Sequence, residues 1–258
     1  MKKYVDNFMQ YRFLLSELVK KGIKLKYRRS YLGMIWSMLE PLLTMIVLTI
    51  VFGTLYGNTD RTFPVYILTG RLLYSFFSQS TKAALKSIRQ NSAMIKKVYV
   101  PKYLFVFSRI FSSFINLMAS YTALILVMIA TRSELHWTVI LSIVPLLLLV
   151  MFSLGVGMIL SAITVKFRDI MHLYSVFLTA LTYLTPVIYP MSILPGWLYK
   201  IVMLNSLTNI LMMFRDVMLN NRIFSISQLF VGAVETAIVI VLGFYVFYKN
   251  QDQFILNI

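Results

Sequence analysis

Long stretches of hydrophobic residues, separated by short polar segments, run along most of this chain. Three of the stretches contain no charged residue over 22, 29 and 27 positions, at 110–131, 137–165 and 173–199. About 20 helical residues cross the hydrocarbon core of a bilayer, so each stretch is long enough to span it. The whole pattern predicts six membrane helices with the approximate bounds 33–56, 63–81, 104–130, 138–164, 172–189 and 226–248.

The segment 190–221, which precedes the last predicted helix, does not have the pattern of a full crossing. It is apolar, but Pro190 and Pro195 interrupt it, and its charge-free run 201–214 has only 14 residues. A run of that length suits a segment that enters the membrane and returns on the same side. We therefore expect a re-entrant region there, with Pro186 and Pro190 bending or ending the fifth span.

The first 32 residues predict a different kind of helix. Apolar residues and one glycine recur there at steps of three and four, while polar and charged residues fall opposite. The apolar side consists of Phe8, Tyr11, Leu15, Leu18, Gly22 and Leu25. A basic amphipathic helix of this kind lies in the membrane interface, with its cations against anionic lipid headgroups.

The composition indicates an all-α integral membrane protein and excludes a soluble globular one. Hydrophobic residues make up 59% of the chain, charged residues 13%, and the mean hydropathy is +0.77. Soluble domains average about 45–50% apolar and about 25% charged residues. Cysteine is absent and the two histidines, His136 and His172, are too few for a histidine-rich metal centre. Nine dispersed acidic residues form no paired motif, which argues against a membrane enzyme.

The net charge of +16 follows the predicted topology, so it indicates no nucleic-acid partner. With the N-terminus inside, the cytoplasmic segments hold 18 of the 25 Lys and Arg residues, and the opposite face holds five. Lys and Arg accumulate on the cytoplasmic side of membrane proteins, so we expect both termini in the cytoplasm. Residues 1–32 carry nine of these cations without an uninterrupted apolar core, which predicts no cleavable signal peptide.

Two charged residues fall deep inside predicted spans. Arg71 lies eight positions from the outer start of the second span, and Glu235 lies nine positions from the outer start of the sixth. A charge at the centre of a membrane helix costs about 2.5–3.5 kcal/mol, so we expect these two at equal depth to pair. A proton relay is the functional alternative. Glu40, beside Pro41 in the first span, either faces a substrate path or caps the bend that the proline imposes.

The longest predicted cytoplasmic connection, 82–103, mixes cations with hydrophobic residues and contains Pro101 near its end. A short helix within it, with Met94, Ile95 and Val98 on one side, would form a docking surface for a cytoplasmic partner. A solvated basic loop that only enforces topology is the alternative reading.

Four motifs occur in a fixed order along the chain: Tyr27–Trp36 followed by Pro41, Asn91–Pro101, Thr185–Pro190 and Leu204–Thr208. With the six-span pattern, they resemble the permease subunits of type-2 ABC exporters, which move cell-surface polysaccharides such as O antigens, capsules and teichoic acids. The chain departs from the family pattern at Ser206, where proline is usual, at Tyr74, where tryptophan is common, and at Glu40, where a neutral residue is usual.

The resemblance implies a homodimer of this chain with two cytoplasmic ATPase subunits, which would hold ATP and magnesium. The chain itself has no G-x-x-x-x-G-K-[ST] segment, so we expect no cofactor in it. The resemblance also implies that the ATPases press on a short helix at about 88–100, through Asn91, Met94, Ile95, Lys96, Lys97, Val98 and Pro101. The implied substrate is a lipid-linked, undecaprenyl-type polysaccharide that crosses the bacterial cytoplasmic (inner) membrane.

The same resemblance implies a substrate path between the two protomers, lined by the first and fifth spans. Aromatic residues, whose faces can pack on sugar rings, cluster in and after the fifth span: Tyr174, Phe177, Tyr183, Tyr189 and Trp197. An aromatic belt at the membrane interface, or simple helix packing, is the alternative role for these residues.

Lys24, Arg28 and Arg29 fall where the amphipathic helix meets the first span, at the depth of the inner headgroups. Arginine presents donors that match phosphate oxygens, so this group suits a lipid pyrophosphate. Cations that merely fix the depth of the helix are the alternative. For the whole chain, the alternative function is an ion-coupled transporter or channel. No inverted repeat is obvious, however, and intramembrane ionisable groups are too few for a relay.

Overall fold

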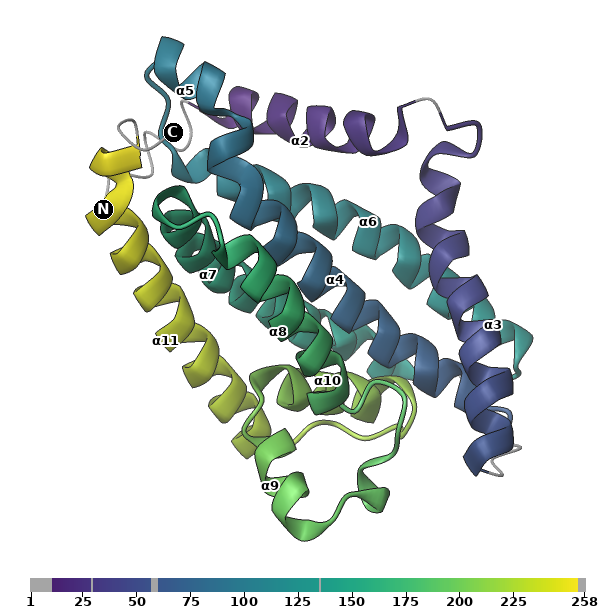
Figure 1. Ribbon diagram of the computed structural model, residues 1–258. Helices are drawn as coiled ribbons and strands as arrows, with labels where there is room; N and C mark the ends of the chain where they lie inside the picture. The colour runs from purple at the N-terminus through teal and green to yellow at the C-terminus, as the bar shows by residue number, and fades with distance from the viewer. Residues whose placement is uncertain (1–10, 29, 57–59, 135, 255–258) are drawn as a thin grey trace.

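The computed structural model describes residues 11–28, 30–56, 60–134 and 136–254. Every regular element in these ranges is a helix, which confirms the expected all-α fold (Figure 1). The α-helices are α2 (Arg12–Tyr27), α3 (Trp36–Tyr56), α4 (Phe63–Gln90), α5 (Ser92–Lys97), α6 (Tyr103–Ala130), α7 (Ile143–Lys166), α8 (Ile170–Leu184), α9 (Gly196–Met203), α10 (Ser206–Met218) and α11 (Ile226–Asn250). The 3₁₀ turns are η1 (Gly33–Ile35), η2 (Trp137–Ser142), η3 (Met191–Ile193) and η4 (Gln251–Gln253).

Four helical segments are long and apolar enough to cross a membrane: Gly33–Leu55, Tyr103–Ala130, Trp137–Lys166 and Ile226–Gln253. They coincide with the first, third, fourth and sixth predicted spans, so the chain is a multi-pass membrane protein. The other two spans, 63–81 and 172–189, stay predictions as crossings. Helix α4 is less apolar than the four, and α8 has only 15 residues because it ends before the proline-containing turn.

Helix α4 occupies the centre of the bundle, where α3, α6, α7 and α8 pack against it (Figure 1). Its buried side is apolar and includes Leu72 and Phe76. We expected this helix to end near residue 81 and to be followed by a loop, but it continues to Gln90. It continues because Leu85 and Ile88 keep the same helical spacing and remain buried, so the apolar side still has a surface to pack against.

Helices α9 and α10 form a pair bent by 90° at the break between them. The side chain of Asn205 holds this break. Its Oδ1 accepts the backbone N–H of Leu207 at 3.1 Å, and its Nδ2 donates to the Leu184 carbonyl at 3.2 Å and to the Thr185 hydroxyl at 2.9 Å. A side-chain cap of this kind begins a helix. The bend is compatible with the re-entrant region expected over 190–221, which stays a prediction.

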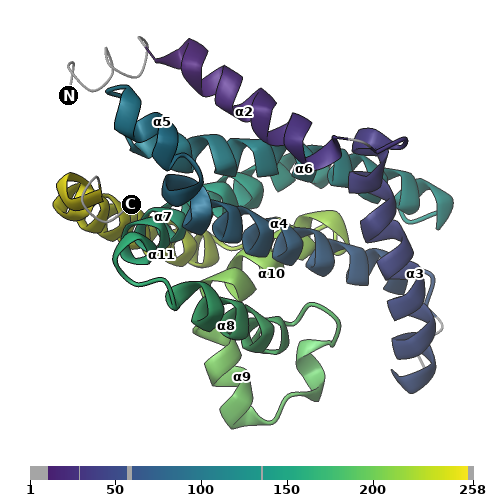
Figure 2. The ribbon, with the colours of Figure 1, turned by 45° about the horizontal axis from the view of Figure 1, so that its top comes forward.

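Helix α2 lies across the end of the bundle where α5 and the last turns of α11 also lie (Figures 1 and 2). We expected its apolar side to face lipid, but much of that side packs on the protein through Tyr11, Leu14, Leu15 and Leu18. Gly22 permits this contact, because a Cβ there would lie 2.6 Å from the Ser112 Oγ of α6. Phe8, also expected on this side, lies outside the described residues.

Helices α7 and α11 approach each other at glycines. A Cβ on Gly243 would lie 2.6 Å from the carbonyl oxygen of Gly155, and a Cβ on Gly155 would lie 2.8 Å from the backbone of Ile240. Close backbone approach increases van der Waals packing, which is a main attraction between membrane helices. Helix α11 is therefore fixed on one side of the bundle, while α3 leans away on the other (Figures 1 and 2).

Candidate functional site

Helix α4 buries its apolar side and leaves a polar side open. From Arg71 to Gln90, nine residues are not buried and eight of these are polar. We call this set the α4 polar face; it consists of Arg71, Ser75, Ser78, Gln79, Lys82, Ala83, Lys86, Arg89 and Gln90. Steps of three and four residues place all of them along one side of the helix. Charges are costly in hydrocarbon, so the α4 polar face meets water or polar groups rather than lipid chains.

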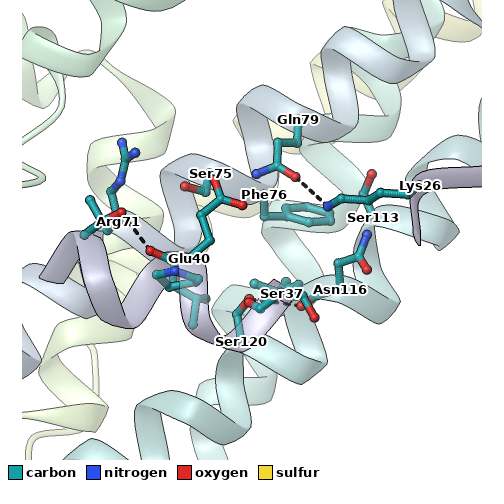
Figure 3. A pocket seen from close by; sticks show the side chains of 14 residues that line it. Lys26, Ser37, Glu40, Arg71, Ser75, Phe76, Gln79, Ser113, Asn116 and Ser120 are labelled. Carbon is teal, nitrogen blue, oxygen red and sulfur yellow. Dashed lines mark hydrogen bonds between the residues drawn. The ribbon is translucent and has the colours of Figure 1, made fainter. Parts of the chain in front are cut away.

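The Arg71 end of the α4 polar face lines a narrow cleft between α3, α4 and α6, with a volume of about 40 Å³ (Figure 3). Most of its lining is polar: Lys26, Ser37, Glu40, Thr44, Arg71, Ser75, Gln79, Ser113, Asn116 and Ser120. Lys26 of α2 donates to Gln79 Oε1 at 3.3 Å at one end of the cleft. Glu40 and Arg71 project from facing helices, and no hydrogen bond joins the two side chains in the described part of the chain. The cleft therefore offers both signs of charge to a visiting group.

Pro41, which lies inside α3, explains one contact of this cleft. Proline has no N–H, so the carbonyl of Ser37 one turn earlier loses its helical donor. The Ser120 hydroxyl of α6 replaces it, donating to the Ser37 oxygen at 2.7 Å. This contact satisfies the carbonyl that the proline leaves free, and both roles expected for Glu40 stay predictions. Glu40 lines the cleft.

A second arginine, Arg215 of α10, is buried at the junction of α4, α10 and the turn after α8. Its side chain is 3% exposed. It donates to the carbonyls of Pro186 at 2.7 Å, Val187 at 3.0 Å and Tyr66 at 3.1 Å, and to the Thr69 hydroxyl at 3.4 Å. The guanidinium also lies 3.6 Å from the centre of the Tyr66 ring, a distance that gives cation–π attraction. These contacts satisfy the cation without a carboxylate.

Gly70 of α4 is what allows this junction to close. A Cβ there would lie 2.6 Å from the Val187 carbonyl oxygen and 2.7 Å from Arg215 Nη2. The Thr185–Pro190 motif therefore supplies backbone acceptors, and the helix opposite has no side chain in their way. Sequence reasoning counted Arg215 as a loop cation on the outer face and missed this role. The signal was present, since Arg215 stands within the apolar residues of Met212–Met218.

The structure does not bring Arg71 and Glu235 together, so the expected charge pair is corrected. Arg71 lines the cleft beside α3, whereas Glu235 is on α11, which packs against α7 and α10. Glu235 Oε2 is buried without a hydrogen-bond partner in the described residues. The two residues lie at similar distances from the starts of their predicted spans. That distance predicts depth in the membrane, but it does not determine which side of the bundle a residue occupies.

The expected docking segment forms helix α5 with exposed residues directly after it. Ile95 is buried and Met94 packs on the core, so these two do not form the expected exposed side. Val98 is 54% exposed and the neighbouring Tyr99, which sequence reasoning did not single out, is 92% exposed. The other expected contacts are distributed between exposed Lys96 and Lys97 and the half-buried Asn91 and Pro101. The available surface is thus centred on Lys96–Tyr99.

Lys102 connects this segment to the end of α11. Its ammonium donates to the Gln251 carbonyl and lies 5.6 Å from the centre of the Phe254 ring. Phe254 is itself buried against Phe247, with ring centres 5.2 Å apart. Burial lowers the pKa of Lys102 below its usual range, and nearby Asp252 acts in the opposite direction. The segment after α5 and the C-terminal turn are therefore held as one unit.

Two of the expected phosphate-binding cations line a hollow between α2 and the turn η1. Lys24 and Arg28 share it with Lys20 and Lys21, and Glu17, which pairs with Lys20 at 2.9 Å, is also in the lining. Arg29, the third expected residue, lies outside the described residues. The described lining holds four cations and one carboxylate, so it attracts anions.

The expected aromatic path divides into buried and exposed members. Tyr174 is buried and donates to the Thr81 hydroxyl of α4 at 2.7 Å, so it fastens α8 and is not available as a path surface. Phe177, Tyr183 and Trp197 are 52%, 73% and 67% exposed. Tyr189 is half-buried and donates to the Tyr183 carbonyl at 2.8 Å. Only the exposed members can contact a passing molecule.

No group of three or more His, Cys, Asp or Glu residues capable of holding a metal occurs among the described residues. Polar and charged residues along one side of a helix in an apolar membrane bundle are typical of a transport pathway. The chain belongs to the ABC-2 type transporter family, which matches residues 14–219. The family resemblance of the four motifs is thereby confirmed.

Several relatives of similar length are named as proteins of polysaccharide export or transport. The chain is 27% identical, over 254 residues and 98% of each chain, to the O-antigen export system permease protein RfbA of Myxococcus xanthus. It is 25% identical, over 248 residues and 93% of each chain, to a protein of the same name from Klebsiella pneumoniae. The polysialic acid transport protein KpsM of Escherichia coli is 22% identical over 255 residues, 98% of each chain.

Proposed function

We propose that this chain is the membrane permease of an ABC exporter that moves a lipid-linked polysaccharide across the bacterial cytoplasmic membrane. The observation that carries the proposal is the α4 polar face, a polar wall kept open inside an apolar bundle. The export permeases among the relatives support polysaccharide as the cargo. Both termini lie in the cytoplasm in this proposal, and ATP and magnesium are bound by a separate ATPase subunit.

The permease works as a homodimer in this proposal, with the path between the protomers. Helices α3 and α8 flank α4, and both leave large side chains uncovered in the single chain, such as Ile50 on α3 and Phe177 on α8. Two α4 polar faces that approached each other across the dimer would enclose a passage lined by hydroxyl, amide and cationic groups. Exposed rings on α8 add apolar surfaces on which sugar rings can pack.

The lipid diphosphate binds in this proposal at the hollow between α2 and η1. Lys24 and Arg28 supply the donors, and Lys20 and Lys21 add charge around them. Charge-assisted hydrogen bonds to phosphate are roughly twice as strong as neutral ones. Replacing Lys24 and Arg28 with Gln should therefore reduce export while the assembled complex is retained. Undiminished export by this double variant would remove the site from the proposal.

The ATPase docks on the surface Lys96–Tyr99 in this proposal. Tyr99 is a large, almost fully exposed aromatic residue, a type that is enriched at protein interfaces. Changing Tyr99 to Ser should weaken the association with the ATPase, whereas the exposed Tyr245 of α11 offers a matched control. Equal retention of the ATPase by both variants would contradict this docking site.

The proposal as a whole is tested by purifying the tagged chain in mild detergent from its native host. An ATPase with Walker motifs, recovered in equal numbers and in a complex of two copies of each chain, is the expected result. Recovery of the chain alone would contradict the proposal and favour an ion-coupled carrier or channel. In that case, Glu40, Arg71 and Glu235 become the first residues to test for coupling.

A further inference from the structure

The cations of helix α4 are all on its open side. Arg71, Lys82, Lys86 and Arg89 belong to the α4 polar face, and α4 contains no acidic residue. From Arg71 to Arg89 is 18 residues, or about 27 Å along the helix axis. Arg71 stands apart in the first half of the helix, and 11 residues, or about 16 Å, separate it from the other three cations, which lie between Lys82 and Arg89.

The elements packed around α4 contribute charges of both signs. Lys26 of α2 lies at the cleft, and Arg109 of α6 donates to Gln90 at 3.0 Å. The carboxylates of the helices packed on α4 are Glu40 of α3, which lines the cleft, Asp169 at the start of α8 and Asp216 of α10. None of these three forms an ion pair with a cation of the α4 polar face in the described part of the chain, and Glu17 of α2 pairs with Lys20.

Topology alone does not account for this arrangement. The accumulation of Lys and Arg on the cytoplasmic side explains Lys82, Lys86 and Arg89, which lie in the last part of α4. It does not explain Arg71, which lies eight residues from the opposite end of the helix, where a cation is costly. A neutral sugar chain needs hydroxyl and amide groups, which Ser75, Ser78 and Gln79 already supply.

From this distribution we infer that the transported glycan is anionic, with carboxylate or phosphate groups in its repeating unit. The inference rests on the proposed export function and adds the chemical class of the cargo. Lys82 and Lys86 attract the acidic groups at the cytoplasmic end of the α4 polar face. Arg71 offers a later contact, so that successive units pass from one weak site to another. Several weak sites allow movement, whereas one tight site would hold the chain.

The charge of the glycan itself is measured after deletion of the gene for this chain in the native host. The polysaccharide that accumulates inside the cell is released from its lipid by mild acid, which removes the lipid diphosphate as a source of charge. The polymer is then applied to an anion exchanger at neutral pH. Retention is the expected result. An unretained, neutral polymer overturns this inference and leaves the export function intact, while failure of any glycan to accumulate overturns both.

The role of the α4 polar face is tested in the full complex with a charge-neutral double variant, Lys82→Gln with Lys86→Gln. Electrostatic focusing raises the local concentration of a charged substrate by at least about tenfold, so export should fall by about that factor. Replacing the same two residues with Arg should restore export. The matched control is Lys200→Gln with Lys249→Gln, which changes charge by the same amount away from this face.

Export, assembly with the ATPase and retention on size-exclusion chromatography are measured for each variant. Normal export by the Gln double variant contradicts the inference. Loss of export by an intact Gln complex, with rescue by Arg, supports it. If the Gln complex fails to assemble, export by the single variant Arg71→Gln is measured instead. The Arg71 side chain forms no hydrogen bond in the described structure, so this variant is expected to assemble. An unchanged export rate overturns the inference, and a reduced rate supports it.

Discussion

Two arginines, Arg71 on the central helix α4 and Arg215 packed against it, differ in their surroundings. Arg215 is enclosed at the junction of α4, α10 and the turn after α8, where three carbonyls, a hydroxyl and an aromatic ring surround it. Arg71 projects from α4 into the cleft beside α3 and forms no hydrogen bond within the described chain. The comparison teaches that one arginine of a membrane bundle can bond backbone carbonyls and hold the fold, while another stays available to bind a transported molecule.

The difference follows from the backbone nearby. Where α8 ends, the carbonyls of Pro186 and Val187 have no helical donors, and unsatisfied carbonyls inside a membrane cost several kcal/mol. Arg215 supplies N–H groups to both of them. Around Arg71 the helices α3, α4 and α6 are continuous, and the one carbonyl freed by Pro41 already accepts from Ser120. The guanidinium of Arg71 therefore has no unsatisfied backbone carbonyl nearby to which it would donate.

Replacing Arg215 with Met should have the largest effect on stability. The change leaves the carbonyls of Pro186, Val187 and Tyr66 without this donor, and each buried acceptor left unsatisfied costs about 1–3 kcal/mol. Thermal unfolding of the purified protein in detergent measures the loss, with Arg222→Met on the exposed outer loop as control. Equal melting temperatures for the two variants would show that Arg215 does not hold the junction.

Gly70→Ala should have the next largest effect. The new methyl group would meet the Val187 carbonyl and the Arg215 guanidinium at less than contact distance, and overpacking of this kind costs about 1–3 kcal/mol. Gly196→Ala is the matched control, because nothing lies within 4 Å of a Cβ built there. Equal melting temperatures for the Gly70 variant and its control would refute the close approach at the junction.

Tyr27→Phe should have a smaller effect on the cleft side. It removes one hydrogen bond, at 2.9 Å, from the Tyr27 hydroxyl to Asn116 of α6. Hydrogen bonds between membrane helices average about 0.6 kcal/mol in double-mutant cycles, so the expected loss is of that size. Thermal unfolding measures it. A loss as large as that of the Arg215 variant would erase the distinction between the two regions.

Arg71→Gln should change stability least, by less than about 0.5 kcal/mol, because no side-chain hydrogen bond or ion pair of the described chain is broken. Export should nevertheless fall. The same variant is measured twice, once by thermal unfolding and once by export in a strain that lacks the native gene. A large drop in melting temperature with unchanged export would assign Arg71 a structural role and contradict the comparison.

The sequence predicted much of the framework, because long apolar runs report membrane helices directly. It placed four apolar spans, found the motif whose Asn205 caps α10, and located the segment that forms α5. The α4 polar face could also have been predicted from the sequence, because Arg71, Ser75, Lys82 and Lys86 recur at helical spacing. We interpreted the inner part of that series as a loop, because its cations resembled a topology signal.

The failures concern which side of the bundle a residue faces. Arg71 and Glu235 were matched by depth, but the position around the bundle is set by tertiary packing, such as the Gly155–Gly243 contact that holds α11 against α7. Tyr174 was assigned to a path by residue type, whereas its bond to Thr81 turns it inward. Arg215 was missed for the same reason, since the carbonyls that receive it come from residues 28 and 29 positions away.

The central claim is that the α4 polar face meets water within the membrane, and cysteine labelling tests it most directly. The chain has no native cysteine, so single cysteines at Ser78 on α4 and at Ile238 on α11 can be compared without background. The nucleophile that attacks a maleimide is the thiolate, which forms at a hydrated site and is disfavoured in apolar surroundings. The account predicts that a hydrophilic maleimide labels the Ser78→Cys variant of the assembled exporter at least about tenfold faster than the Ile238→Cys variant. Equal protection of both cysteines would contradict it.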